Sequence, residues 1–227
     1  MTTDSQNTRP KRPQLSDDAA RYVRNLIMAG EILPGASVRP EAIGEALDIS
    51  ATPAREALQV LRVEGFLDLL PRRGFIVAPL TGADIRDLFR ANALISGELA
   101  ARAATVATSE QIAELQALHY ELLAAAGRRD LEALEEKNFL FHRQINRIAE
   151  SRKLAWVLGI IDRYVPRLFY SEIEGWPSAT SEGHLNILES IKAGDAERAR
   201  ETMTLHVTHS GDLLADQFDK RTIERSA

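Results

Sequence analysis

The chain has 227 residues, of which 44% are hydrophobic and 27% are charged, and its formal net charge is −5. This composition is typical of a protein with a hydrophobic core and excludes a disordered chain. The absence of cysteine excludes disulfides and thiolate metal sites. No apolar run reaches the roughly 18 residues of a membrane span, and the polar N-terminus lacks the apolar segment of an export signal. We therefore expect a cytoplasmic protein with no membrane partner.

The charge is unevenly distributed along the chain. Residues 9–79 contain ten Lys or Arg against nine Asp or Glu, a net of +1. Residues 81–227 contain eighteen against twenty-three, a net of −5. The difference is small, but it leaves room for a basic face in the first third of the chain, where contacts to nucleic-acid phosphates would have to lie.

The first third predicts three helices followed by a β-hairpin. Residues 1–13 are polar and basic and are interpreted as a flexible arm. Ser16 supplies a cap for the first helix, Gly30 ends it, and Pro53 falls in the first turn of the third helix, where its missing N–H costs nothing. Together these elements predict a winged helix-turn-helix over residues 14–79. The expected helices begin near 16, 40 and 51, and the hairpin strands cover 66–70 and 75–78.

The remainder, residues 80–227, shows only helical signals. Turn-forming residues divide it into six segments, which are enough for a helical bundle with its own core. The predicted fold class is therefore mostly α, with an N-terminal winged helix-turn-helix and a C-terminal all-α six-helix bundle. The six helices are expected near 82–105, 109–127, 130–150, 153–173, 181–193 and 195–217.

An ordered set of short motifs lies within residues 32–79. They are Pro34-Gly35, Ser50-Ala51-Thr52-Pro53-Ala54-Arg55-Glu56-Ala57-Leu58, Glu64-Gly65 and Arg73-Gly74-Phe75-Ile76-Val77. These motifs resemble the DNA-binding domain of the GntR family of bacterial regulators. The resemblance implies that the first domain binds double-stranded operator DNA.

The helix that follows Ser50 is the expected recognition helix. A helix N-terminus presents unpaired N–H groups and a positive dipole end to phosphate, and Ser50 and Thr52 add hydroxyl groups. Arg55, one turn into the helix, is long enough to reach a guanine edge or a phosphate. This chain has Ala51 where the family usually has an arginine, so the operator sequence of relatives cannot be carried over.

The tip of the hairpin is the expected wing. Arg72 and Arg73 could place a guanidinium beside the minor groove, and Gly74 would allow close approach of the backbone. Taken singly, each of these arginines could equally be a solvated surface charge. The wing is therefore a DNA-binding candidate because of its place in the ordered motif set.

Histidines of the helical domain are spaced so that they could converge. His184 and His206 are 22 residues apart with a turn midway, so at about 1.5 Å per residue they return to the same height on antiparallel helices. Asn138 and His142 are four residues apart and share one helix face. Three imidazoles and an amide oxygen suit a divalent transition metal such as zinc, nickel, manganese or iron. The alternative is that they are surface or hydrogen-bonded core residues.

The segments around these histidines resemble the FCD effector domain that accompanies GntR winged helices in the FadR-type branch. That resemblance implies a metal site made by an Asp four residues before a His, together with two further His. His142, His184 and His206 match these positions, and Asn138 stands where the Asp is expected. An amide oxygen brings no negative charge, so we expect weaker binding and a more cationic metal.

The same resemblance implies a small carboxylate effector that binds near the metal. The family often has an Arg, and four residues later a Glu, where this chain has Asn92 and Ser96, so the effector's identity stays open. Arg143 and His209 are further effector-binding candidates, although an exposed arginine would simply be a solvated charge. His119 is expected at the surface. Two additional candidate carboxylate partners are Arg163 and Arg167.

Three functional hypotheses follow. The favoured one is a ligand-responsive repressor, in which a homodimer of bundles presents two winged helices to a pseudo-palindromic operator. The second is a metal-dependent enzyme that uses the three-histidine site, although the sequence offers no His-Glu-x-x-His helix and no obvious general base. The third is a winged helix used only for protein contact.

Overall fold

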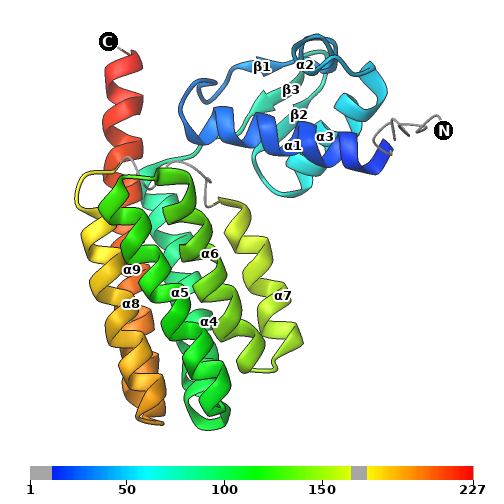
Figure 1. The fold of residues 1–227 in the computed structure, drawn as a ribbon. Helices are drawn as coiled ribbons and strands as arrows, with labels where there is room; N and C mark the ends of the chain where they lie inside the picture. Colours follow the sequence, from blue (N-terminus) through cyan, green and yellow to red (C-terminus); the bar gives the residue numbers. More distant parts are fainter. Residues whose placement is uncertain (1–11, 165–172, 227) are drawn as a thin grey trace, which may run out of the picture. The chain divides into compact units, whose positions relative to one another are not determined.

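The computed structural model describes residues 12–164 and 173–226, and it divides into two compact units, Met1–Leu80 and Thr81–Ala227. Figure 1 shows a small sheet with three helices in the first unit and a helical bundle in the second. Most of the expected N-terminal arm lies outside the described residues. Its last two residues belong to the first helix, which begins at Arg12 rather than near Ser16.

The first unit has the winged helix-turn-helix fold that the sequence predicted. A third strand, β1, was not expected because its two residues are too short to show an alternating pattern; it extends the hairpin into an antiparallel sheet of order β1-β3-β2. The elements are α1 (Arg12–Met28), β1 (Ser37–Val38), α2 (Pro40–Leu47), α3 (Ala51–Val63), β2 (Leu67–Leu70) and β3 (Gly74–Val77).

The turn between α2 and α3 is tight, and it fixes the start of α3. Asp48 ends α2 in the left-handed conformation with φ 53°, and Ser50 begins α3 in extended backbone. A Cβ on Gly44 would lie 2.7 Å from the carbonyl oxygen of Ile49, so only glycine allows this approach. Leu58 and Leu61 on the inner face of α3 are fully buried, which leaves the opposite face of α3 exposed.

The described part of the second unit contains six α-helices, as the sequence predicted. Three differ from the expected bounds: α8 begins at Trp176 rather than near 181, α9 continues to Ser226 rather than ending near 217, and α7 ends at Ile161 although a helix was expected over 153–173. Part of that expected helix lies outside the described residues. The elements are α4 (Gly82–Val106), α5 (Ser109–Arg128), α6 (Leu131–Ile148), α7 (Arg152–Ile161), the 3-10 turn η1 (Asp162–Tyr164), α8 (Trp176–Lys192) and α9 (Ala196–Ser226).

Helices α4 and α9 form the antiparallel centre of the bundle (Figure 1). Small residues allow their backbones to approach: a Cβ on Gly97 would meet the Thr204 side chain, and one on Gly211 would meet Phe89. At the start of α4, the Gly82 N–H donates to the Asp219 carboxylate at 2.9 Å. Within the described residues, no helix combines the length and the hydropathy that a membrane span requires.

Candidate metal centre and DNA-binding surface

Three histidines from three helices meet inside the second unit. The Nε2 atom of His142 on α6 lies 3.3 Å from Nε2 of His184 on α8 and 3.2 Å from Nε2 of His206 on α9. One ring nitrogen from each residue lies within 4.8 Å of the others. A zinc–nitrogen distance of about 2.1 Å and tetrahedral angles would separate ligand nitrogens by about 3.4 Å. The observed spacing therefore fits a common metal ion.

The protonation state of these three histidines also favours the binding of a cation. A neutral imidazole nitrogen carries either one hydrogen or one lone pair, so Nε2 of His142 cannot form good hydrogen bonds with both neighbours. Burial lowers the pKa of His142 to about 4 and lowers the pKa values of His184 and His206 well below 6.5, so all three rings are neutral at pH 7. A bound cation would satisfy three lone pairs at once.

Asn138 lies one turn before His142 on α6, at the position of the expected fourth ligand. Its Oδ1 atom is buried and has no hydrogen-bond partner among the described residues. Leaving a buried acceptor unpaired costs roughly 1–3 kcal/mol, which ligation of a cation would remove. The residues present therefore fit a metal held by His142, His184 and His206, with Asn138 as a neutral oxygen donor.

Asn92 and Ser96 are buried on α4, with 7% and 5% of their surfaces exposed. Ser96 donates to Oδ1 of Asn92 at 2.8 Å, and Nδ2 of Asn92 donates to Asp162 at 2.9 Å. Desolvation raises the pKa of Asp162 to about 6, and the hydrogen bond from Asn92 opposes that rise. The carbonyl of Ala93, next to Asn92, accepts a hydrogen bond from Thr204, which is two residues before His206 on α9. Asn92 and Ser96 therefore lie near the level of the three histidines.

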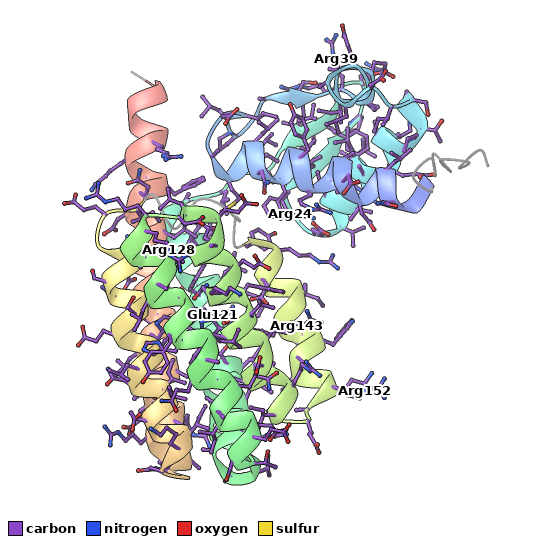
Figure 2. All side chains as sticks on the ribbon, viewed as in Figure 1. Arg24, Arg39, Glu121, Arg128, Arg143 and Arg152 are labelled. Carbon is purple, nitrogen blue, oxygen red and sulfur yellow. The ribbon has the colours of Figure 1, made fainter. Side chains whose placement is uncertain are left out.

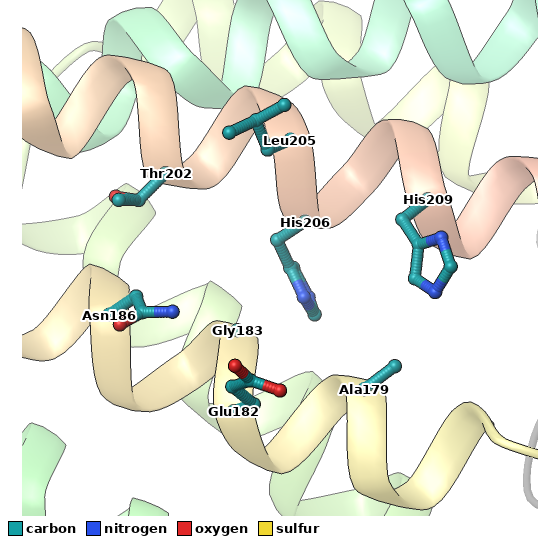
Figure 3. Close-up of a pocket in the computed structure, with 8 residues that line it drawn as sticks. All are labelled: Ala179, Glu182, Gly183, Asn186, Thr202, Leu205, His206 and His209. Atoms are coloured by element: carbon teal, nitrogen blue, oxygen red, sulfur yellow. The ribbon is translucent and has the colours of Figure 1, made fainter.

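The remaining effector candidates lie elsewhere. Arg143 and Arg163 are exposed, and Arg167 lies outside the described residues. His209 is exposed and lines a groove of about 240 Å³ between α8 and α9 (Figure 3). In the same view the ring of His206 points from α9 toward Gly183 on α8, where an added Cβ would clash with Nδ1 of His206. His209 is thus on the outer side of the histidine cluster.

The expectation for His119 was wrong. It is only 3% exposed and lies on the buried face of α5 with Leu115 and Leu122. Its spacing of four residues after Leu115 was a signal of burial in the sequence. Thr180, which is 1% exposed and one turn before His184 on α8, was also missed.

In the first unit, the predicted base-reading residues lie at the exposed start of α3. Ser50 is the N-cap residue, and its hydroxyl forms no cap hydrogen bond, so it is available to a ligand. Thr52 is exposed, and Arg55 is 63% exposed beside Glu41 on α2, with 3.7 Å between the charged atoms. An exposed pair at this distance contributes little, so Arg55 can exchange Glu41 for another partner.

The wing is a tight turn between β2 and β3 whose residues are exposed. Arg72 adopts the left-handed conformation with φ 63°, as does Gly74 with φ 75°. The Arg73 N–H donates to the Leu70 carbonyl at 3.2 Å and closes the turn. One cation that sequence reasoning missed is Arg39, which is exposed just before α2 (Figure 2) and two residues from Glu41, the partner of Arg55.

Comparison with known proteins agrees with this description. The model of the FCD domain matches residues 87–209, and the model of the gntR family of bacterial regulatory proteins matches residues 15–77. The HTH-type transcriptional repressor RspR of Escherichia coli (strain K12) is 26% identical over 210 residues, which is 91% of each chain. A probable D-xylose utilization operon transcriptional repressor of Paenarthrobacter nicotinovorans is 28% identical over 207 residues, which is 90% of each chain.

Among solved structures, E. coli McbR/YncC is similar in fold, with a TM-score of 0.69 and 24% sequence identity over 90% of this chain and 98% of that chain. The relatives are transcription regulators and not enzymes, which removes the metal-enzyme hypothesis. Because the FCD model alone covers more than half of the sequence, and the gntR model covers most of the first unit, the chain belongs to the GntR family of bacterial transcription regulators, in the group that carries an FCD domain.

Proposed function

We propose that this regulator is a cytoplasmic, homodimeric repressor whose affinity for operator DNA depends on a small carboxylate effector and a divalent transition metal in the second unit. The observation that carries the proposal is the convergence of three histidines from three helices, in which Nε2 of His142 lies 3.3 Å from Nε2 of His184 and 3.2 Å from Nε2 of His206. His142, His184 and His206 would hold the metal, and Asn138 would complete the protein ligands.

A carboxylate is the effector class that the charges favour. Every buried polar side chain in the described part of the second unit is neutral. A divalent ion held by three imidazoles and an amide would therefore keep its full charge in a poorly solvated site. Bound metal would supply a Lewis-acidic position for an anion, and Asn92 and Ser96 would offer hydrogen bonds nearby.

Exposed apolar side chains support a dimer formed by the second unit. Leu94 on α4 is 72% exposed and Trp156 on α7 is 65% exposed, and Val157 and Ile160 are more than a third exposed. Helices α4 and α7 pack together through Leu99 and Leu158. An apolar surface on two neighbouring helices is typical of a protein interface, and a two-fold dimer would present two winged helices to two half-sites.

The proposal is tested by fluorescence anisotropy with labelled DNA from upstream of the regulator's own gene. The full chain is treated with chelator and then titrated with zinc, nickel or manganese, with and without small mono- and dicarboxylates. We expect tighter binding than to random DNA of equal length, and a change in affinity only when metal and carboxylate are both present.

Two variants sharpen this test. His142→Ala should abolish the response to carboxylate while leaving affinity for DNA in the absence of effector unchanged. His209→Ala, which alters an exposed histidine outside the three-histidine cluster, should keep the response to metal and carboxylate together. Equal affinity for upstream and random DNA would contradict the repressor proposal and favour a winged helix used for protein contact.

A further inference from the structure

A layer of polar side chains crosses the second unit at the level of the three histidines. The Lys137–Glu121 ion pair at 2.6 Å aligns α6 with α5, so His119, two residues before Glu121, lies close to the level of the α6 metal ligands. On α8, Thr180 and His184 are one turn apart and share a face. Helices α5 and α8 pack directly against each other, so their polar residues face the same interior.

Three atoms of this layer are buried and have no partner among the described residues. They are Nδ1 of His119, Oγ1 of Thr180 and Nδ1 of His184. These residues are only 3%, 1% and 0% exposed, respectively. Buried polar atoms are nearly always hydrogen-bonded, so three unpaired atoms in one layer indicate a shared hydrogen-bonding partner.

Two contacts hold the ring of His184, one at its face and one at its Nε2 atom. Its face stacks on Phe141 with ring centroids 4.0 Å apart, and its Nε2 points to His142. Its Nδ1 therefore lies on the opposite edge of the ring, away from the histidine cluster. A histidine that ligates a metal almost always donates its other ring N–H to a partner, which fixes the ring and its tautomer. The electrostatic influence of His119 on the pKa of His184 is consistent with their proximity.

We propose that His119 and Thr180 are positioning residues that hold His184 through one buried water molecule. The His184 Nδ1–H donates to the water, and the water donates to Nδ1 of His119 and to Oγ1 of Thr180. One water can make these three hydrogen bonds, which is the usual number for a buried water. The inference rests on the proposed metal site, since its purpose is to keep Nε2 of His184 directed at the ion.

The test is binding of Co²⁺ by the full chain, measured by calorimetry and by the visible absorption of the bound ion. Thr180→Val and His119→Leu each remove one hydrogen-bonding group, and we expect each to weaken Co²⁺ binding by about 10- to 100-fold and to alter the visible spectrum. His119→Gln keeps an acceptor and should restore most of the affinity. Ser190→Ala is the matched control, because this buried α8 hydroxyl already donates to the Asn186 carbonyl at 2.8 Å.

A second readout works without metal. In chelator, a water-bridged Thr180 hydroxyl stabilises the fold, so Thr180→Val should lower the melting temperature, whereas removing a truly unpaired hydroxyl would raise it. If the wild-type chain binds no Co²⁺ but Thr180→Val lowers the melting temperature, the metal proposal fails and the water bridge stands. Wild-type affinity, spectrum and melting temperature in both Thr180→Val and His119→Leu would overturn the inference.

Discussion

Acidification of the metal-free chain should destabilise the second unit through its histidines, at pH values above those at which ordinary carboxylates titrate. Asp162, whose pKa is raised to about 6, acts in the opposite direction, because at that carboxyl the folded chain takes up the proton first. Burial lowers the pKa of His142 to about 4, while an unfolded histidine titrates near 6.5. The unfolded chain therefore binds protons first as the pH falls. The stability that depends on a neutral His142 is fully present above pH 6.5 and is lost progressively as the pH falls toward 4.

The magnitude follows from the two pKa values. At about 1.4 kcal/mol for each pH unit, His142 alone should cost about 2 kcal/mol of unfolding free energy at pH 5 and about 3 kcal/mol near pH 4. The pKa values of His184 and His206 are lowered in the same direction, so they add to this loss. A loss of this size is a large fraction of the stability of a typical domain.

The assay is urea unfolding with excess chelator, followed by tryptophan fluorescence at a series of pH values. Both tryptophans of the chain, Trp156 on α7 and Trp176 on α8, belong to the second unit, so the signal reports the bundle alone. His142→Asn removes the titrating group and serves as the control. The reasoning would be refuted if wild type and His142→Asn lost stability in parallel between about pH 6.5 and pH 5.

Three further outcomes are expected. Arg55→Ala should cost ~1–3 kcal/mol on upstream DNA and little on random DNA in anisotropy titrations; equal losses would make it a phosphate contact only. Arg72→Asn, chosen because asparagine tolerates the left-handed backbone, combined with Arg73→Ala should lower the salt dependence of binding by up to about two counterions; an unchanged slope removes the wing from the interface. Gly183→Ala should displace the adjacent ring of His206, a proposed metal ligand, and weaken metal binding measured by calorimetry, whereas Gly127→Ala, with open space around it, should not.

Much of the fold could be predicted because, in these segments, the residue pattern along the chain agrees with the tertiary packing. Pro53 falls within the first turn of α3, and the spacing of His184 and His206 about the Gly194–Asp195 turn brings them to one level, as helix geometry requires. Trp176 was misread because the Gly175-Trp176-Pro177 run was interpreted as a break, although proline is favoured in the first turn of a helix and Pro177 is here the second residue of α8.

The rest of the site depends on tertiary contacts that no local pattern shows. Asn92 hydrogen-bonds Asp162, 70 residues away, and this pairing exists only because α4 packs beside the end of α7. His119 was expected at the surface, yet its helical spacing places it on the buried stripe of α5. Burial also changes the chemistry: an ordinary histidine would lose metal near pH 6.5, while the lowered pKa of His142 moves that loss to more acidic pH.

The central claim is that His142, His184 and His206 hold a divalent metal, and a metal titration tests it most directly. Chelator-treated full chain, purified without an affinity tag, is titrated with zinc, nickel and manganese by calorimetry, and its melting temperature is recorded in parallel. The account predicts one ion per chain with a rise in melting temperature, loss of both in His142→Ala, and tighter binding in Asn138→Asp, which restores a negative ligand. No uptake of any of these metals and no shift in melting temperature would contradict it.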